Sequence, residues 1–442
     1  MSQLDLLGDL IKAAKHAGAD AADAVMVAGT SLSVTLRAGQ TEHLERAEGR
    51  DLGLRVFVGR RSAMVSSSSL DPASFARLAE QAVAMARVVP EDPYGGLADE
   101  ARMPDDIDLD VCDMAEPDAA SLIGRAKLAE EAALAVAGVT QAEGAEASYS
   151  RSESAIVTSA GFAGRTARSG HSVSVSALAG TGTGMERDYD YTSAVFLADL
   201  EDAGLIGRNA GERAVRRLNP SRPKTAIVSV IYDPRVSAGL IGHFIGAING
   251  AAIARGTSFL KDSLGKQIFA PGIVIRDDPR RVRGLRSRIF DGEGVPTAAR
   301  DLIADGVLTG WLLDSRTARQ LGLKTTGNAA RGTSAPPSPS ATNLTLQPGT
   351  MTPMELMADI KEGLYVTELM GTSINGITGD YSRGASGFMI RNGQLAEPVG
   401  EITIAGTLQH IFAHMVPAND LRLRRGTDAP TVRVDGLTMA GG

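Results

Sequence analysis

The chain has 442 residues, of which 43% are hydrophobic, 22% charged and only 4% aromatic. This composition is typical of a globular protein with two or three domains whose cores are built from small aliphatic side chains. The net charge of −7, with no basic run interleaved with aromatics, argues against nucleic-acid binding. The single cysteine, Cys112, excludes an internal disulfide and a multi-cysteine zinc site, so we expect a cytoplasmic protein.

The N-terminal half shows one order of elements twice. Residues 1–88 form a first α+β half, with helices predicted at 1–19 and 71–87, strands at 25–39 and 51–69, and a polar turn at 41–48. The first helix is amphipathic and carries scattered charges, unlike a signal peptide. Residues 89–118 are an acidic linker, with eleven Asp or Glu and one Arg over 91–118. The second half, 119–220, has helices at 118–137 and 203–218 around short strands at 155–159, 165–177 and 192–199.

Residues 221–442 are predicted to form a β-rich C-terminal domain that contains a buried helix. After a strand at 225–232, the segment 233–256 is apolar nearly all round, which predicts one long buried helix with Asp233 as its N-cap and Pro234 at its first position. The dipeptides Asp305-Gly306 and Asn392-Gly393 predict β-hairpins, and further helices are predicted at 353–363 and 408–415.

The expected fold class is therefore α+β, with an N-terminal two-layer region on an antiparallel sheet in two similar halves and a β-rich C-terminal domain. Only 236–254 approaches the length of a membrane span. Its four glycines, its His and Asn, and its lack of flanking aromatics argue against one.

Three histidines are the candidates for metal chemistry. A protease zinc site on a helix needs two imidazoles and a carboxylate close together, but Phe244 follows His243 and the next acidic residue is Asp262. A hydrogen-bonded core histidine is the favoured interpretation of His243. His410 and His414 lie four residues apart on a predicted helix and could share a metal, but no acidic residue lies between them. All three stay weak metal candidates.

Two loops rich in Gly, Ser and Asn, at 325–339 and 371–387, are either flexible surface loops or the walls of a cleft. Beside β-structure, such loops would suit an extended peptide held by main-chain hydrogen bonds. The candidate cleft residues are Thr326, Gly327, Asn328, Arg331, Gly379, Tyr381 and Ser386.

The C-terminal half resembles the TldD/TldE (PmbA) family in the order and wording of several blocks. These are GHFIGAINGAAIARGTSFLKDSLGKQIF, DGEGVPT, TTGNAARG, GITGDYSRGASGFMIRNGQLAEPVGEITIAG and PTVRVDGLTMAGG. The resemblance is specific over 224–442 and compatible with the layout of 1–220. It implies a peptidase family with one zinc-binding member, TldD, whose helix carries His-Glu-x-x-x-His and which has a further cysteine ligand near the C-terminus.

This sequence departs from the TldD pattern at each ligand position. The helix reads His243-Phe244-Ile245-Gly246-Ala247-Ile248, and the segment 424–430 reads RRGTDAP without a cysteine. The resemblance thus implies a non-catalytic PmbA/TldE-type subunit that binds no cofactor itself. Zinc would lie in a TldD-like partner that processes small or unfolded peptides. The alternatives are an independently active metallopeptidase with non-standard ligands, and a homodimeric peptide-binding protein without a protease partner.

Overall fold

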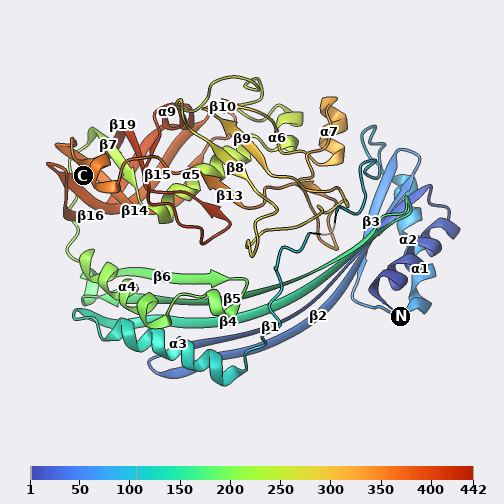
Figure 1. Ribbon diagram of the computed structural model, residues 1–442, viewed down its shortest axis with the longest axis horizontal. Helices are drawn as coiled ribbons and strands as arrows, with labels where there is room; N and C mark the ends of the chain where they lie inside the picture. Colours follow the sequence, from blue (N-terminus) through green and yellow to red (C-terminus); the bar gives the residue numbers. More distant parts are fainter. Residues whose placement is uncertain (1, 106, 442) are drawn as a thin grey trace.

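The computed structural model describes residues 2–105 and 107–441 and has the expected α+β fold. A long, curved antiparallel sheet from the N-terminal half carries helices on its convex face, and the β-rich C-terminal body lies over its concave face (Figure 1). No described helix combines the length and the apolar character that crossing a bilayer requires.

The N-terminal sheet joins both halves of that region into one surface. Its strand order is β3-β2-β1-β4-β5-β6, and the two halves meet where β1 pairs with β4. The strands are β1 (Ala21–Arg37), β2 (Gln40–Val58), β3 (Arg61–Ser67), β4 (Val139–Thr158), β5 (Ala163–Ala179) and β6 (Glu186–Ala194).

Three predictions about this sheet were wrong. The strand predicted at 192–199 overlaps only the end of Glu186–Ala194, and Leu197–Asp199 form a 3-10 turn. The polar turn predicted at 41–48 lies inside β2, because the chain reverses at Ala38 and Gly39, which have positive φ values of 51° and 74°. The strand predicted at 155–159 is only the end of β4, which is 20 residues long. Most of β4 consists of small and polar residues, which carry little hydrophobic alternation, and the strand is held by pairing on both sides.

Four helices cover the convex face in two pairs. They are α1 (Gln3–His16) with α2 (Phe75–Val88), and α3 (Ala119–Leu134) with α4 (Ala203–Arg216). Short 3-10 turns lie at η1 (Pro72–Ser74), η2 (Gly182–Gly184) and η3 (Leu197–Asp199). The second pair packs backbone to backbone, because a Cβ at Gly207 would lie 2.0 Å from the carbonyl oxygen of Ala129.

The C-terminal body contains a closed barrel. Strands β16, β15, β14, β7 and β19 pair in that order, and β19 pairs back to β16. Their bounds are β7 (Ala226–Tyr232), β14 (Glu362–Ile374), β15 (Asp380–Arg391), β16 (Gln394–Thr407) and β19 (Val432–Ala440), with β17 (Val416–Pro417) at the edge. The predicted hairpin at Asn392-Gly393 connects β15 and β16.

A smaller sheet extends the body toward the concave face of the N-terminal sheet. Its order is β10-β9-β8-β13-β18, from β8 (Ile275–Asp277), β9 (Arg300–Ala304), β10 (Val307–Leu308), β13 (Leu344–Leu346) and β18 (Thr427–Asp428). A separate ladder joins β11 (Ala329–Ala330) to β12 (Ser338–Pro339). The remaining helices are α7 (Ser315–Leu321), α8 (Pro353–Met357) and α9 (Leu408–Ala413).

The predicted long helix at 233–256 is two helices. The first, α5 (Pro234–Ala247), begins as predicted, with the Asp233 carboxylate accepting from the backbone N–H of Arg235 at 2.9 Å. The second, α6 (Gly250–Arg255), begins at its own N-cap, Asn249, whose side chain accepts from the N–H of Ala251 at 3.0 Å. Likewise, the helix predicted at 353–363 ends at Met357, and residues from Glu362 onward belong to β14.

Candidate functional site

The helix α5 has one buried face and one open face, which corrects the prediction that it is buried all round. Leu240, Ile241 and Phe244 lie in the core of the C-terminal body. On the other side, Gly242 and Gly246 are exposed, and a Cβ at either would meet no atom within 4 Å. Glycine lowers the stability of a helix relative to alanine, and it is usually kept where another group must approach the backbone closely. This open face is therefore the unusual feature of α5.

His243 lies at the edge of the open face and is half-buried. Its ring meets that of Tyr381 edge to face, with 6.2 Å between centroids. Burial and the positive charge of Arg383 both lower the pKa of His243 below its ordinary value, so the imidazole is mainly neutral at pH 7. A neutral imidazole can bind a metal, so the question is whether other ligands lie close to it.

The residues of α5 do not fit the zinc site that the resemblance implies for the catalytic subunit. Phe244 and Ile248, which occupy the places of the Glu and the second His, are both fully buried. Phe244 packs edge to face on Phe269 and Phe412, at 5.3 and 6.1 Å between centroids. Across the described ranges, no three His, Cys, Asp or Glu residues cluster closely enough to hold a metal ion.

His410 and His414 stack on each other at 4.1 Å between ring centroids, as their spacing predicts. Each ring already contacts a backbone carbonyl. His410 Nε2 lies 2.8 Å from the Asp435 oxygen, and His414 Nδ1 lies 2.9 Å from the His410 oxygen. The nearby carboxylate of Asp420 accepts from the N–H and hydroxyl of Thr431. The pair therefore acts as a surface pair that holds the end of α9.

The first group of predicted cleft residues lies where the C-terminal body faces the N-terminal sheet. The Thr326 hydroxyl accepts from the N–H of Leu313 at 2.8 Å, and Gly327 has a φ of +69°. The Asn328 amide is buried and donates to the Asp277 carboxylate at 2.9 Å. The loop is thus ordered and partly buried, unlike the flexible surface loop that its composition allowed.

The second group lies in and beside the barrel, apart from the first group in the fold. The carbonyl of Gly379 accepts from the N–H of Leu408 at 2.7 Å, which anchors the start of α9. Tyr381 and Ser386 on β15 are both buried. Burial raises the pKa of the Tyr381 phenol to about 12. The structure does not bring the two groups together in one cleft wall, and the cleft stays a prediction.

A buried charge network, which the sequence did not reveal, joins the two parts of the molecule. Asp23 on β1 pairs with Arg55 on β2 at 2.5 Å and with Arg331, from the first cleft group, at 2.6 Å. Burial raises the pKa of Asp23, but the charges of Arg331 and Arg55 outweigh it and leave a net lowered pKa. These residues are far apart in the sequence, so no local pattern could have paired them.

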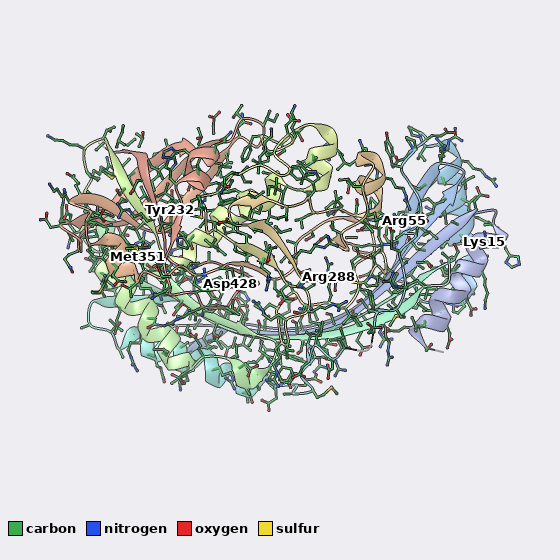
Figure 2. All side chains as sticks on the ribbon, turned by 45° about the horizontal axis from the view of Figure 1, so that its top comes forward. Lys15, Arg55, Tyr232, Arg288, Met351 and Asp428 are labelled. Atoms are coloured by element: carbon green, nitrogen blue, oxygen red, sulfur yellow. The ribbon has the colours of Figure 1, made fainter. Side chains whose placement is uncertain are left out.

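Glu293 is the fourth member of this network. Its carboxylate lies 3.9 Å from Arg55 and accepts from the N–H of Ser315 at 2.8 Å. Burial raises the pKa of Glu293 to about 7, against the opposing charge of Arg55. Arg55 and Arg288 both lie between the N-terminal sheet and the C-terminal body (Figure 2). The network therefore fixes how the body sits on the sheet.

Comparison with known proteins matches the whole length of the chain. Descriptions of PmbA/TldA metallopeptidase domains match residues 22–86 (domain 1), 112–218 (central domain) and 225–441 (C-terminal domain). Metalloprotease PmbA of Escherichia coli O157:H7 is 36% identical over 425 residues, which cover 96% of this chain and 92% of the relative. A PmbA homolog of Haemophilus influenzae is 34% identical, covering 98% of this chain and 94% of the relative.

Solved structures show the same fold. A putative modulator of DNA gyrase from Bacteroides thetaiotaomicron has a TM-score of 0.91 at 27% identity, covering 99% of this chain and 98% of its own. TldE from Thermococcus kodakarensis has a TM-score of 0.86 at 19% identity, covering 99% and 100% respectively. At that identity, TldE is evidence for the fold alone.

Proposed function

The chain belongs to the PmbA/TldD family of metallopeptidases, and from this premise we propose that it is a non-catalytic subunit that pairs with a TldD-like catalytic chain. The zinc and the hydrolysis of small or unfolded peptides belong to the partner in this proposal. This chain supplies part of the enclosing wall and of the subunit interface. A cytoplasmic location is part of the proposal, since the one cysteine can form no internal disulfide.

One observation carries the proposal: α5 keeps His243 at its half-exposed edge but turns positions 244 and 248 into the core. On a regular helix, residues i and i+5 project about 140° apart, so a ligand set at 243, 244 and 248 needs a widened turn. Here the helix is regular through 247. The aromatic contacts of Phe244 fix that geometry.

The test uses this chain, a TldD-like chain from the same organism, and their mixture. We expect zinc, measured by mass spectrometry, only in the partner, and cleavage of a fluorogenic peptide by preparations that contain it. Size-exclusion chromatography of the mixture should show a complex of the two chains. His243→Ala in this chain should leave the zinc content and activity of the mixture unchanged, as should His16→Ala on the exposed face of α1.

Two results would overturn the proposal in favour of its rivals. Stoichiometric zinc in the isolated chain, lost in His243→Ala but kept in His16→Ala, would indicate an active peptidase with unusual ligands. A stable homodimer that binds peptides and forms no complex with the TldD-like chain would indicate a peptide-binding protein without a protease partner.

A further inference from the structure

A cavity of about 410 Å³ lies between the concave face of the N-terminal sheet and the C-terminal body. Its floor is formed by β1, β4 and β5, and its roof by residues 287–292 and 330–331. Residues 107–111 close one side. The volume falls in the range of about 300–1,000 Å³ that is common for small-molecule sites. His243 is not among the residues that line it.

Two guanidinium groups in this cavity have no carboxylate partner within residues 2–105 and 107–441. Among the described residues, Arg168 on β5 and Arg288 in the roof form no ion pair, and their side chains donate only to backbone carbonyls. Arg168 donates to Leu285 and Ser287, and the Nε of Arg288 is buried without any partner. Burial and the repulsion of Arg288 lower the pKa of Arg168.

The carboxylates that line the cavity are already engaged elsewhere. Asp291 accepts backbone N–H groups of Glu293, Val295 and Ala329 at 2.9–3.0 Å. Asp108 is exposed and accepts from the N–H of Asp110 at 2.8 Å. Buried cations in proteins are normally paired, because an isolated buried charge loses its hydration without compensation. Among the described residues these two neighbouring guanidiniums are unpaired, and only the charges of Asp291 and Asp277 partly oppose the cost of burying Arg288, so the two arginines indicate the place of an anion.

A second arginine-rich cavity at the N-terminus of α5 provides a contrast within the same chain. Three of its arginines, Arg213, Arg235 and Arg424, each pair with a carboxylate at 2.5–3.0 Å. The other two arginines that line it, Arg422 and Arg425, form no ion pair among the described residues, so this cavity has counterions for three of its five arginines. In the first cavity Arg331 is paired with Asp23, whereas Arg168 and Arg288 form no ion pair among the described residues.

The remaining walls indicate what kind of anion fits. On the floor, the hydroxyls of Ser154 and Thr166 bond to each other at 2.8 Å, which leaves one hydroxyl proton free to donate. Beside them, Val25, Ile156 and Phe290 form an apolar wall that belongs to a buried cluster. Inorganic phosphate would leave this apolar wall uncovered. A ligand that carries a carboxylate on an apolar body would place the carboxylate against the arginines and hydroxyls and its apolar part against this wall.

We propose that this cavity binds an organic carboxylate with an apolar side chain, held between Arg168 and Arg288 and by the free hydroxyl of the Ser154–Thr166 pair. A planar carboxylate matches the fork of a guanidinium. The carboxylate can come from a free small acid or from the C-terminus of a peptide. The site is formed within this chain alone and does not depend on the proposed subunit function.

Isothermal titration calorimetry of the isolated chain tests the proposal with four probes. These are N-acetyl-leucine, acetyl-Ala-Ala-Leu with a free C-terminus, the same peptide as its C-terminal amide, and inorganic phosphate. We expect at least one of the two acids to bind and the amide and phosphate not to bind. Binding of N-acetyl-leucine identifies a small acid as sufficient, and binding of the peptide acid alone identifies a peptide C-terminus. Equal binding of acid and amide, binding of phosphate alone, or no binding by any probe overturns the proposal.

Variants then locate the binding site. Arg288→Lys keeps the charge but loses the planar fork, and we expect about tenfold weaker binding of the acid. Thr166→Val removes a hydroxyl at nearly constant shape and should also weaken the binding of the acid. This variant provides a second test if Arg288→Lys fails to fold. Arg77→Gln is the matched control, because Arg77 is exposed on α2 and does not line the cavity. Unchanged affinity in both Arg288→Lys and Thr166→Val would refute the assignment.

Discussion

The raised pKa of Glu293 makes a specific prediction about how stability depends on pH. The carboxyl is 5% exposed in the folded chain, where burial raises its pKa to about 7 from an ordinary value of 4.5. Between these two values the unfolded chain has lost the proton while the folded chain retains it. Because the folded state binds more protons, this group contributes stability that is fully present below pH 4.5 and is lost as pH rises through 7.

The size of the effect follows from the separation of the two pKa values. One unit corresponds to about 1.36 kcal/mol, so a separation of about 2.5 units gives about 3 kcal/mol in the free energy of unfolding. Glu293→Gln stays neutral at every pH and keeps an oxygen that can accept from the N–H of Ser315. Relative to the natural chain, the variant should therefore gain about 3 kcal/mol between pH 4.5 and pH 8.

Urea unfolding of both proteins across this pH range measures the effect. The difference between variant and natural chain isolates Glu293, because all other titrating groups are common to both. Glu212→Gln, on the exposed side of α4, is the control and should show a constant difference. Parallel stability curves for Glu293→Gln and the natural chain, within about 1 kcal/mol at all pH values, would refute the reasoning from burial.

Three further changes test the buried charge network and the packing of α5 by urea unfolding at pH 7. Asp23→Asn should lower the free energy of unfolding by about 3–5 kcal/mol, because it leaves buried Arg331 without its carboxylate partner and Arg55 with only the more distant Glu293. Asp9→Asn in an exposed pair should cost less than about 1 kcal/mol. Phe244→Ala should cost about 3–5 kcal/mol through the cavity that it leaves. Gly242→Ala should raise the free energy by about 0.5–1 kcal/mol, because its Cβ meets nothing, and a loss would show that the open face of α5 is packed in solution.

The sequence was sufficient for the fold class and for features that depend on a few neighbouring residues. The N-cap at Asp233 with Pro234, and the hairpin at Asp305-Gly306, were predicted from local chemistry and are present. Neighbouring residues also indicated the break between α5 and α6, which the prediction missed. Asn249 before Gly250 is an N-cap signal in the middle of an apolar segment, and hydrophobicity alone concealed the break between α5 and α6.

Features that depend on pairing between residues far apart in the sequence could not be predicted from it. The ends of β2 and β4 carry polar or small side chains, and they are strands because β1 lies between them. The network around Asp23 joins residues from opposite ends of the chain, and each of its arginines resembles a surface arginine in sequence. The same is true of Arg288, which stands among other arginines in the segment 276–288 but lies between the N-terminal sheet and the C-terminal body in the fold (Figure 2).

The packing of α5 decides which chemistry its residues could support. To form one site with His243, side chains at positions 244 and 248 would have to face the same side as its imidazole. Instead both side chains are fully buried, and Phe244 is surrounded by Phe269 and Phe412. A carboxylate at position 244 would be buried among aromatic rings, at a high cost in solvation. The residues at positions 244 and 248 are therefore part of the hydrophobic core of this chain. Introducing the motif by substitution would destabilise the body before it created a metal site.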